Sequence, residues 1–105
     1  NHGGRQLDGS IAPFDALKDI VDAVGGKIEI ILDGGIRRGT HIIKALSLGA
    51  NACSGGRMYL YALAGAGEKG VQKSVIKLKE ELYRGMMLMG CKSIKDLSRK
   101  NLRFR

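Results

Sequence analysis

Segments with helical and strand-like patterns alternate along this chain, and no two-residue hairpin turn separates them. Apolar residues at helical spacing end in glycine and are followed by short apolar runs of strand length. Strands that are joined by helices rather than by hairpins run parallel. The sequence therefore predicts an α/β fold with these elements: helix 12–24, strand 28–32, helix 41–48 capped by Thr40, strand 52–55, helices 58–64 and 68–89, and a short helical turn at 93–97.

The two predicted strands differ in quality. The run Ile28–Leu32 is mostly β-branched with almost no polar alternation, which is typical of a strand buried on both faces. The run "ACSG" is a weaker strand, because serine and glycine replace the expected bulky residues. Two strands alone would leave both outer edges unpaired. We therefore interpret the chain as part of a larger β/α repeat, incomplete on its own.

Positive charge is concentrated in the second part of the chain. Residues 66–105 contain eleven Lys or Arg and four Asp or Glu, so they carry +7 of the net charge of +8. Such an excess either attracts an anionic surface or forms a solvated helix face, and the second interpretation is favoured because such faces are common. Only three Tyr and two Phe are available to stack on bases, so no nucleic-acid partner is expected.

The cysteines Cys53 and Cys91 lack both the spacing and the histidine companions of a metal site or a disulfide framework. Cys53 is expected to be a small core residue. No apolar run approaches the roughly 18 residues of a membrane span, and no signal peptide is visible. We expect a cytoplasmic setting, and a peripheral contact at the inner face of the cytoplasmic membrane is compatible with the charge.

Both predicted strands end in glycine followed closely by arginine, in "LDGGIRRG" and "SGGR". In β/α proteins, ligands bind beyond the carboxyl ends of the strands, where N–H groups of loops and helix N-termini are free. Glycine lets an anion approach the backbone, and arginine donates paired hydrogen bonds to phosphate oxygens. One such loop could be a plain turn with a solvated arginine, but two successive ones favour a phosphate site. The candidates are Gly34, Gly35, Arg37, Gly55, Gly56 and Arg57.

The chain begins "NHGGRQLDG", where a histidine and an arginine flank two glycines. This arrangement is typical of an active-site loop, and imidazole is the side chain best suited to proton transfer near neutral pH. Taken alone, His2 would more often be an exposed terminal residue. If the loop is functional, His2 and Arg5 should face the same pocket as Arg37 and Arg57.

The stretches "NHGGRQLDG", "LDGGIRRGT", "ALSLGA", "GGRMYLYALA" and "MGCKSIKDL", in this order and spacing, resemble the C-terminal third of the FMN-dependent 2-hydroxy-acid dehydrogenases. This family includes glycolate oxidase, flavocytochrome b2 and bacterial L-lactate dehydrogenase. The resemblance implies a (β/α)8 TIM barrel, which typically needs about 250 residues. Residues 1–105 would form its C-terminal portion, with strands 7 and 8 at 28–32 and 52–55, and an N-terminal barrel segment would be missing.

The resemblance also implies roles for the matching residues, with FMN as the cofactor and no metal. His2 would be the base that takes the proton of the substrate hydroxyl, and Arg5 would hold the substrate carboxylate. FMN contacts would come from both glycine loops: Asp33, Gly34, Gly35, Arg37, Gly56 and Arg57. His41 replaces the aspartate that is usual in the family after Gly-Thr, and we interpret it as a helix-surface residue without a catalytic role.

For the complete barrel, the resemblance implies oxidation of an L-2-hydroxy acid, with L-lactate to pyruvate as the expected reaction. An acceptor such as quinone or oxygen would take the electrons, and the complete protein is expected to be a homo-oligomer. The 105 residues alone are expected to have no turnover, because further substrate and flavin contacts would lie upstream. The alternative is an inactive truncated module that binds phosphate or FMN, or that self-associates to cover its strand edges.

Overall fold

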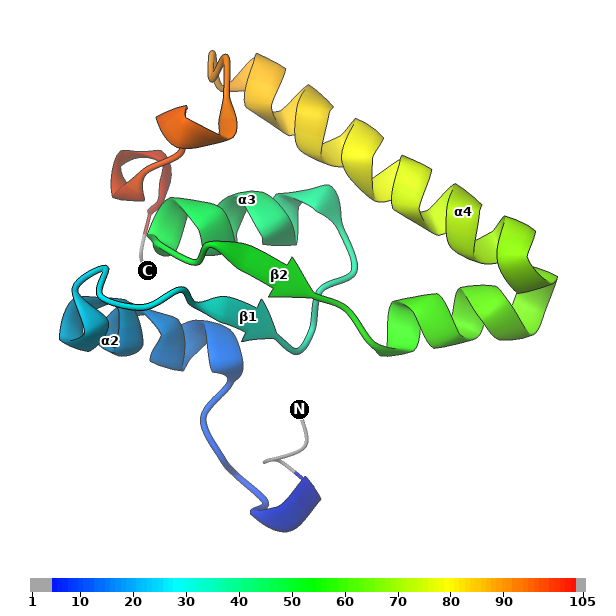
Figure 1. The fold of residues 1–105 in the computed structure, drawn as a ribbon, viewed down its shortest axis with the longest axis horizontal. Helices are drawn as coiled ribbons and strands as arrows, with labels where there is room; N and C mark the ends of the chain where they lie inside the picture. Colours follow the sequence, from blue (N-terminus) through cyan, green and yellow to red (C-terminus); the bar gives the residue numbers. More distant parts are fainter. Residues whose placement is uncertain (1–4, 104–105) are drawn as a thin grey trace.

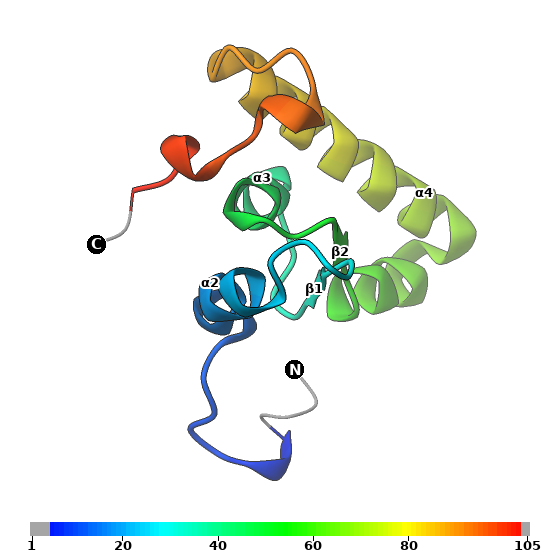
Figure 2. The same cartoon turned by 60° about the vertical axis from the view of Figure 1, so that its left-hand side comes forward.

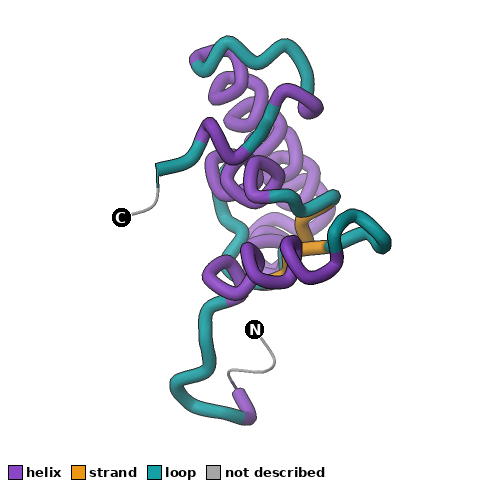
Figure 3. Tube along the Cα trace, turned by 90° about the vertical axis from the view of Figure 1, so that its left-hand side faces the viewer, coloured by secondary structure: helices purple, strands orange, loops and turns teal. Residues whose placement is uncertain are grey.

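The structure is a computed structural model, and it describes residues 5–103. Its elements follow the predicted order (Figure 1), which confirms the α/β character of the chain. Helices make up most of it, and the two short strands lie side by side among them (Figure 3). The elements are α2 (Pro13–Val24), β1 (Ile31–Asp33), α3 (Gly39–Leu48), β2 (Ala52–Ser54), α4 (Arg57–Leu88) and the 3-10 turns η1 (Ile94–Asp96) and η2 (Arg99–Asn101).

The strands β1 and β2 pair in parallel, as predicted, with Leu32 opposite Cys53. Helix α3 makes the connection between them (Figure 2). Asn51 extends the pairing before the strands begin. Its N–H donates to the Ile30 carbonyl oxygen at 2.8 Å, and its Oδ1 accepts from the Ile30 N–H at 2.8 Å. This double contact fixes the register, because a shift of one residue would break both bonds.

The prediction that the first strand is buried on both faces is wrong for the described structure. Leu32 is 5% exposed, whereas Ile31 beside it is 66% exposed, and so is Ile28 before the strand. Successive side chains of a strand point to opposite faces. Helices α2 and α3 cover the face that carries Leu32 and leave the other face open. β1 is also shorter than predicted, because it begins at Ile31 rather than Ile28.

Helix α3 is the centre of the hydrophobic packing, and it lies between the strands and the second part of α4 (Figure 1). Its Ala45 and Leu48 pack with residues of α2, β1 and the loops, in a cluster made of Leu17, Leu32, Ile36, Ala45, Leu48 and Ala50. Its Ile43 packs on the opposite side in a second cluster with Met86, Cys91 and Leu97. Cys53 is half-buried against the first cluster, in keeping with its predicted core position.

Helix α4 is bent into two arms (Figure 1). The backbone leaves the helical region at Ala66 (φ −152°) and Gly67 (φ 56°). This break separates residues 57–65 from residues 68–88 and agrees with the two helices predicted there. The left-handed φ of Gly67 is the conformation that glycine adopts without steric cost.

The predicted cap of the second helix is wrong. Helix α3 begins at Gly39, one residue before Thr40, and its N-cap residue Arg38 makes no side-chain capping bond. The Gly39 N–H instead donates to Glu81 Oε2 of α4 at 2.9 Å. A carboxylate from a distant helix therefore supplies the acceptor that a local side chain was expected to provide. Of the glycines predicted to end helices, Gly25 and Gly49 are C-caps with positive φ, and Gly90, with φ 71°, follows the end of α4 at Leu88.

Candidate functional site

A cavity of about 160 Å³ lies at the carboxyl ends of the two strands. Within the described chain it collects the sequence-predicted site residues except Gly55, which does not line it. Three segments far apart in sequence contribute to it: the start of the chain, the loop after β1 and the start of α4. The lining residues are Arg5, Asp33, Gly34, Gly35, Ile36, Arg37, Gly56, Arg57, Met58 and Leu60. The placement agrees with the expectation that both glycine loops meet at one edge of the sheet.

The loop after β1 takes its shape from two successive glycines. Gly34 has φ 103° and Gly35 has φ 75°, a region that side chains with a Cβ rarely adopt. The next residue, Ile36, is 7% exposed and packs into the core. The chain therefore turns sharply, anchors itself at Ile36 and presents Arg37 at the surface beside the cavity.

The second wall of the cavity is the N-terminus of α4. Gly56 precedes the helix, and its carbonyl oxygen accepts the N–H groups of Tyr59 at 3.0 Å and Leu60 at 3.2 Å. The N–H groups of Arg57 and Met58 come before these and have no acceptor within the helix. Unpaired N–H groups and the positive end of the helix dipole favour an anion at this position.

The charges that line the cavity are predominantly positive. Arg5, Arg37 and Arg57 line the cavity together with one carboxylate residue, Asp33. Arg37 and Arg57 are exposed, so their guanidinium groups remain hydrated in the absence of a ligand. Three forked donors around a small cavity are suited to an oxyanion, because each guanidinium can donate two parallel hydrogen bonds.

His2, the predicted base, lies outside the described residues. Its expected position facing Arg37 and Arg57 therefore stays a prediction. Arg5, the predicted carboxylate ligand, is described and lines the cavity.

Sequence analysis missed the contacts of His41. This residue lies in the first turn of α3, and its Nδ1 is 3.2 Å from the Arg37 backbone nitrogen and 3.1 Å from the Gly35 carbonyl oxygen. It is half-buried against the loop after β1, so it is a surface residue of α3 that also contacts the backbone of this loop. The signal in the sequence was its spacing, four residues after Arg37, where a first-turn side chain can reach back to the preceding loop.

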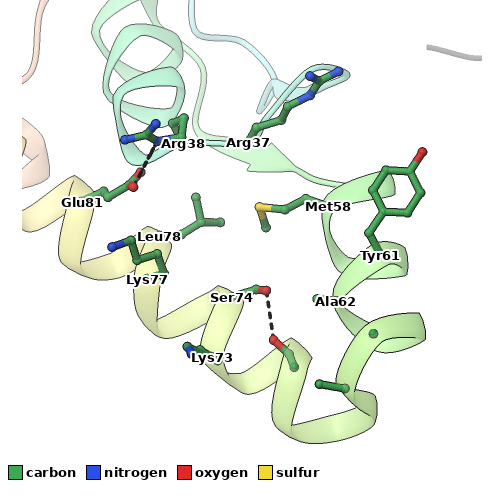
Figure 4. Close-up of a pocket in the computed structure, with 13 residues that line it drawn as sticks. Arg37, Arg38, Met58, Tyr61, Ala62, Lys73, Ser74, Lys77, Leu78 and Glu81 are labelled. Atoms are coloured by element: carbon green, nitrogen blue, oxygen red, sulfur yellow. Dashed lines mark hydrogen bonds and ion pairs between the residues drawn. The ribbon is translucent and has the colours of Figure 1, made fainter.

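A larger cleft of about 720 Å³ adjoins the cavity and lies between the two arms of α4 (Figure 4). Arg37 and Met58 line both spaces. At the far side of the cleft, Arg38 Nε donates to both carboxylate oxygens of Glu81, at 3.0 and 3.1 Å. The pKa of Glu81 is lowered, first by the Gly39 N–H and then by Arg38. This contact fastens the end of the glycine loop to α4.

The described residues contain no group of three or more His, Cys, Asp or Glu side chains placed to hold a metal ion. None of the helices in residues 5–103 is long and apolar enough to cross a membrane.

The geometry defines a β/α unit with an arginine-lined cavity at one edge of its sheet, and the comparisons with known proteins identify its family. A profile described as "FMN-dependent dehydrogenase" matches residues 1–104, so the chain belongs to this family. The L-lactate oxidase of Nostoc sp. (strain PCC 7120 / SAG 25.82 / UTEX 2576) is 56% identical over 97 residues, which cover 92% of this chain and 27% of that protein. The 2-hydroxyacid oxidase 1 of Mus musculus is 52% identical over 99 residues, 94% of this chain and 27% of that protein.

Solved structures of similar sequence also superpose on this fold. An active mutant of (S)-mandelate dehydrogenase superposes with a TM-score of 0.90 at 42% identity, covering 100% of this chain and 29% of that one. A flavocytochrome b2 variant superposes with a TM-score of 0.88 at 41% identity, covering 95% of this chain and 27% of that one. The chain thus spans less than a third of the length of the relatives it matches.

Proposed function

We propose that this chain supplies the phosphate-binding edge, the base and the substrate-carboxylate arginine of a (β/α)8-barrel enzyme that oxidises L-2-hydroxy acids with FMN. The observation that carries the proposal is the convergence on one cavity of Arg5, Asp33, Gly34, Gly35, Arg37, Gly56 and Arg57. Membership of the FMN-dependent dehydrogenase family gives this anion site a cofactor with a phosphate group.

The cavity fits one end of FMN. Its volume of about 160 Å³ is below the roughly 300–1,000 Å³ of pockets that enclose a whole drug-sized ligand. It therefore suits the phosphate and not the flavin ring, which would extend away from it. The donor set also suits phosphate, because it combines the N-terminus of α4 with the forked donors of Arg37 and Arg57.

Within this assignment each residue has a distinct task. FMN, when bound, accepts the equivalent of a hydride from the substrate. Arg5 binds the substrate carboxylate through its guanidinium and so orients the 2-hydroxyl group. His2 takes the proton of that hydroxyl, and its imidazole is suited to this near neutral pH. Asp33, Gly35 and Arg37 would hold the ribityl chain and phosphate from the end of β1, and Gly56 and Arg57 would do so from the end of β2.

The proposed substrate is L-lactate, which is oxidised to pyruvate. This choice is supported by the 56% identity with a protein named L-lactate oxidase. Electrons would pass to an acceptor such as oxygen or quinone, and the relatives named as oxidases favour oxygen. We place the protein in the cytoplasm, where its cysteines, which form no disulfide, would remain reduced. The basic C-terminal part would permit a peripheral contact with an anionic membrane.

The open face of the sheet supports completion by further barrel segments. Ile31 and Ile28 are each 66% exposed on or beside β1, although their side chains are apolar. In a (β/α)8 barrel this face would line the interior, where side chains from neighbouring strands fill the space. We propose that the complete protein contains such segments upstream and assembles as a homo-oligomer.

The test compares FMN with riboflavin, which has the same ring and no phosphate, in calorimetric titrations of the 105-residue chain. We expect FMN to bind and riboflavin to bind at least tenfold more weakly, because charge-assisted hydrogen bonds would be lost. Arg37→Gln and Arg57→Gln should each reduce FMN affinity about tenfold. Lys79→Gln, which removes an exposed charge outside the cavity, is the control and should change little. Equal binding of FMN and riboflavin would contradict the proposal.

The second candidate is a module that self-associates through its sheet. It is supported by the same exposed Ile31 and by the two-stranded sheet, whose outer edges are unpaired within the described chain. Analytical ultracentrifugation separates the two candidates. A stable dimer without affinity for FMN would favour self-association, and a monomer that binds FMN would favour the cofactor site.

A further inference from the structure

The first arm of α4, residues 57–65, begins with the helix N-terminus that forms one wall of the cavity. None of its residues is buried, and Tyr61 and Leu63 are 71% and 53% exposed. The buried residues of α4 all lie in the second arm, residues 68–88. Within the described chain, core packing therefore does not fix the direction of the first arm. Its direction depends on its two ends, the junction with β2 and the break at Gly67, which we call the elbow.

The second arm of α4, by contrast, is held against α3 (Figure 1). Its Met86 packs with Ile43 of α3 in the second hydrophobic cluster. Its Glu81 carboxylate accepts the Gly39 N–H at 2.9 Å. The second arm is therefore a fixed support, and the elbow determines how the first arm leaves it.

Gly70, three residues after the elbow, lies where the two arms meet. An added Cβ at this position would be 2.1 Å from the carbonyl oxygen of Ala62 in the first arm and 3.0 Å from its carbonyl carbon. Both are backbone atoms, so no side-chain rotation can relieve the contact. Ser74, one turn further along the second arm, donates its hydroxyl to the Gly70 carbonyl oxygen at 3.0 Å on the cleft side (Figure 4). The arms meet at this angle because residue 70 has no Cβ.

We propose that Gly70 is a positioning residue for the anion site: it sets the direction of the first arm and so aims the N–H groups of Arg57 and Met58 at the cavity. This inference rests on the proposed function, because it takes the cavity to be the phosphate site. A Cβ at position 70 needs at least 3.0 Å and would displace the Ala62 carbonyl group by about 1 Å. Backbone hydrogen bonds make the arm rigid, and Arg57 lies further from the elbow than Ala62. The helix N-terminus therefore moves at least as far when the elbow opens.

A movement of this size separates the two walls of the cavity. The loop after β1, which carries Arg37, would stay in place, because Ile36 anchors it in the core and Glu81 holds its end. Hydrogen bonds to oxygen require donor–acceptor distances of about 2.7–3.2 Å and weaken steeply when they are misaligned. An anion bound by Arg37 would therefore lose its bonds to the N–H groups of the helix.

The test compares Gly70→Ala with Gly65→Ala, the same substitution in the same helix at a position where the Cβ would meet no atom within 4 Å. The probe is sulfate, and its affinity for the 105-residue chain is measured by calorimetry at neutral pH. We expect Gly70→Ala to bind sulfate about tenfold more weakly than the wild type, because a charge-assisted hydrogen bond is lost. Gly65→Ala should bind sulfate as the wild type does. Equal sulfate affinities of the two variants would overturn the inference.

Urea unfolding and circular dichroism of the same variants distinguish positioning from a purely structural role. A purely structural role of Gly70 would lower the unfolding midpoint without changing the sulfate affinity of the folded protein. If Gly70→Ala does not fold, Gly67→Ala replaces it in the comparison. Gly67 has φ 56° and ψ −145°, a conformation essentially restricted to glycine, so this variant must also change the elbow. It should likewise weaken sulfate binding, and an unchanged affinity would overturn the inference.

A second readout separates this inference from the proposed function. In 15N NMR spectra without any anion, the amide resonances of Arg57 and Met58 should shift in Gly70→Ala and stay fixed in Gly65→Ala, although residue 65 is nearer to them in sequence. If sulfate binds to none of the proteins but these resonances shift in Gly70→Ala, the proposed phosphate site fails and the positioning of the helix N-terminus stands. Identical Arg57 and Met58 resonances in the two variants would refute the positioning itself.

Discussion

Replacing Gly39 by alanine is expected to destabilise the packing of α3 against α4. An added Cβ at this position would lie 2.3 Å from the Leu82 backbone nitrogen and 2.6 Å from the Glu81 carbonyl carbon. Both are backbone atoms of α4, so no side-chain rotation can relieve the contact. The helices would have to separate, and Ile43 and Met86, which pack together across the same interface, would lose part of their contact.

Overpacking of this kind costs about 1–3 kcal/mol in the free energy of unfolding. With a urea slope of about 1–3 kcal/mol per molar, the unfolding midpoint should fall by about 1 M. Gly65→Ala is the matched control, because its Cβ would meet no atom within 4 Å. Alanine is the better helix former by about 0.5–1 kcal/mol, so this change should be neutral or stabilising.

The measurement is urea unfolding followed by far-ultraviolet circular dichroism, with wild type and both variants side by side. A midpoint for Gly39→Ala equal to that of Gly65→Ala would refute the reasoning, because it would mean that α3 and α4 do not approach closely at this point. A change of slope with an unchanged midpoint would point to altered compactness of the unfolded chain instead.

Four further outcomes are expected. Gly85→Ala places a Cβ 2.3 Å from Ile43 Cδ1, so its cost should shrink in an Ile43→Val background, which lacks that atom; a double-mutant cycle in urea measures this. Glu81→Gln should lower stability at neutral pH. The folded-state pKa of Glu81 is below its usual 4.5. The difference in stability should therefore begin to shrink below pH 4.5 and should vanish once the pH has fallen through the folded-state pKa, as acid unfolding curves would reveal. Burial raises the pKa of the Cys53 thiol, so Cys53 should be alkylated more slowly than a free thiol at pH 8. The 105 residues alone should not bleach FMN with L-lactate under anaerobic conditions, and bleaching at an enzymatic rate would contradict the incomplete-site interpretation.

The parts of the fold that sequence analysis predicted correctly are those governed by local chemistry. Helix α2 follows from its apolar spacing and ends at Gly25, whose left-handed φ is a property of the residue itself. The cavity was predictable because both strands end in glycine and arginine, and parallel strands present their carboxyl ends at one edge. The predicted separation of helices 58–64 and 68–89 agrees with the break at Ala66 and Gly67.

The errors concern contacts between segments that are distant in sequence. The burial of Ile31 was overestimated, because an apolar run does not say which faces of a strand are covered. Thr40 was preferred as a cap because it is a good local candidate, whereas Glu81 supplies the acceptor from 42 residues away. His41 was undervalued because its partners depend on the left-handed turn at Gly34 and Gly35, which brings the Gly35 carbonyl oxygen to the ring.

The same contacts explain why a short loop could serve as a rigid anion site. The segment between β1 and α3 is fixed at its centre by Ile36 in the core, at its start by the pairing of β1, and at its end by Glu81. His41 adds a fourth contact from the first turn of α3. A loop that is ordered before the ligand arrives loses little conformational entropy on binding. Loosening the Glu81 contact should therefore weaken anion binding even though Glu81 does not line the cavity, and a calorimetric titration of Glu81→Gln with sulfate, beside the wild type, tests this.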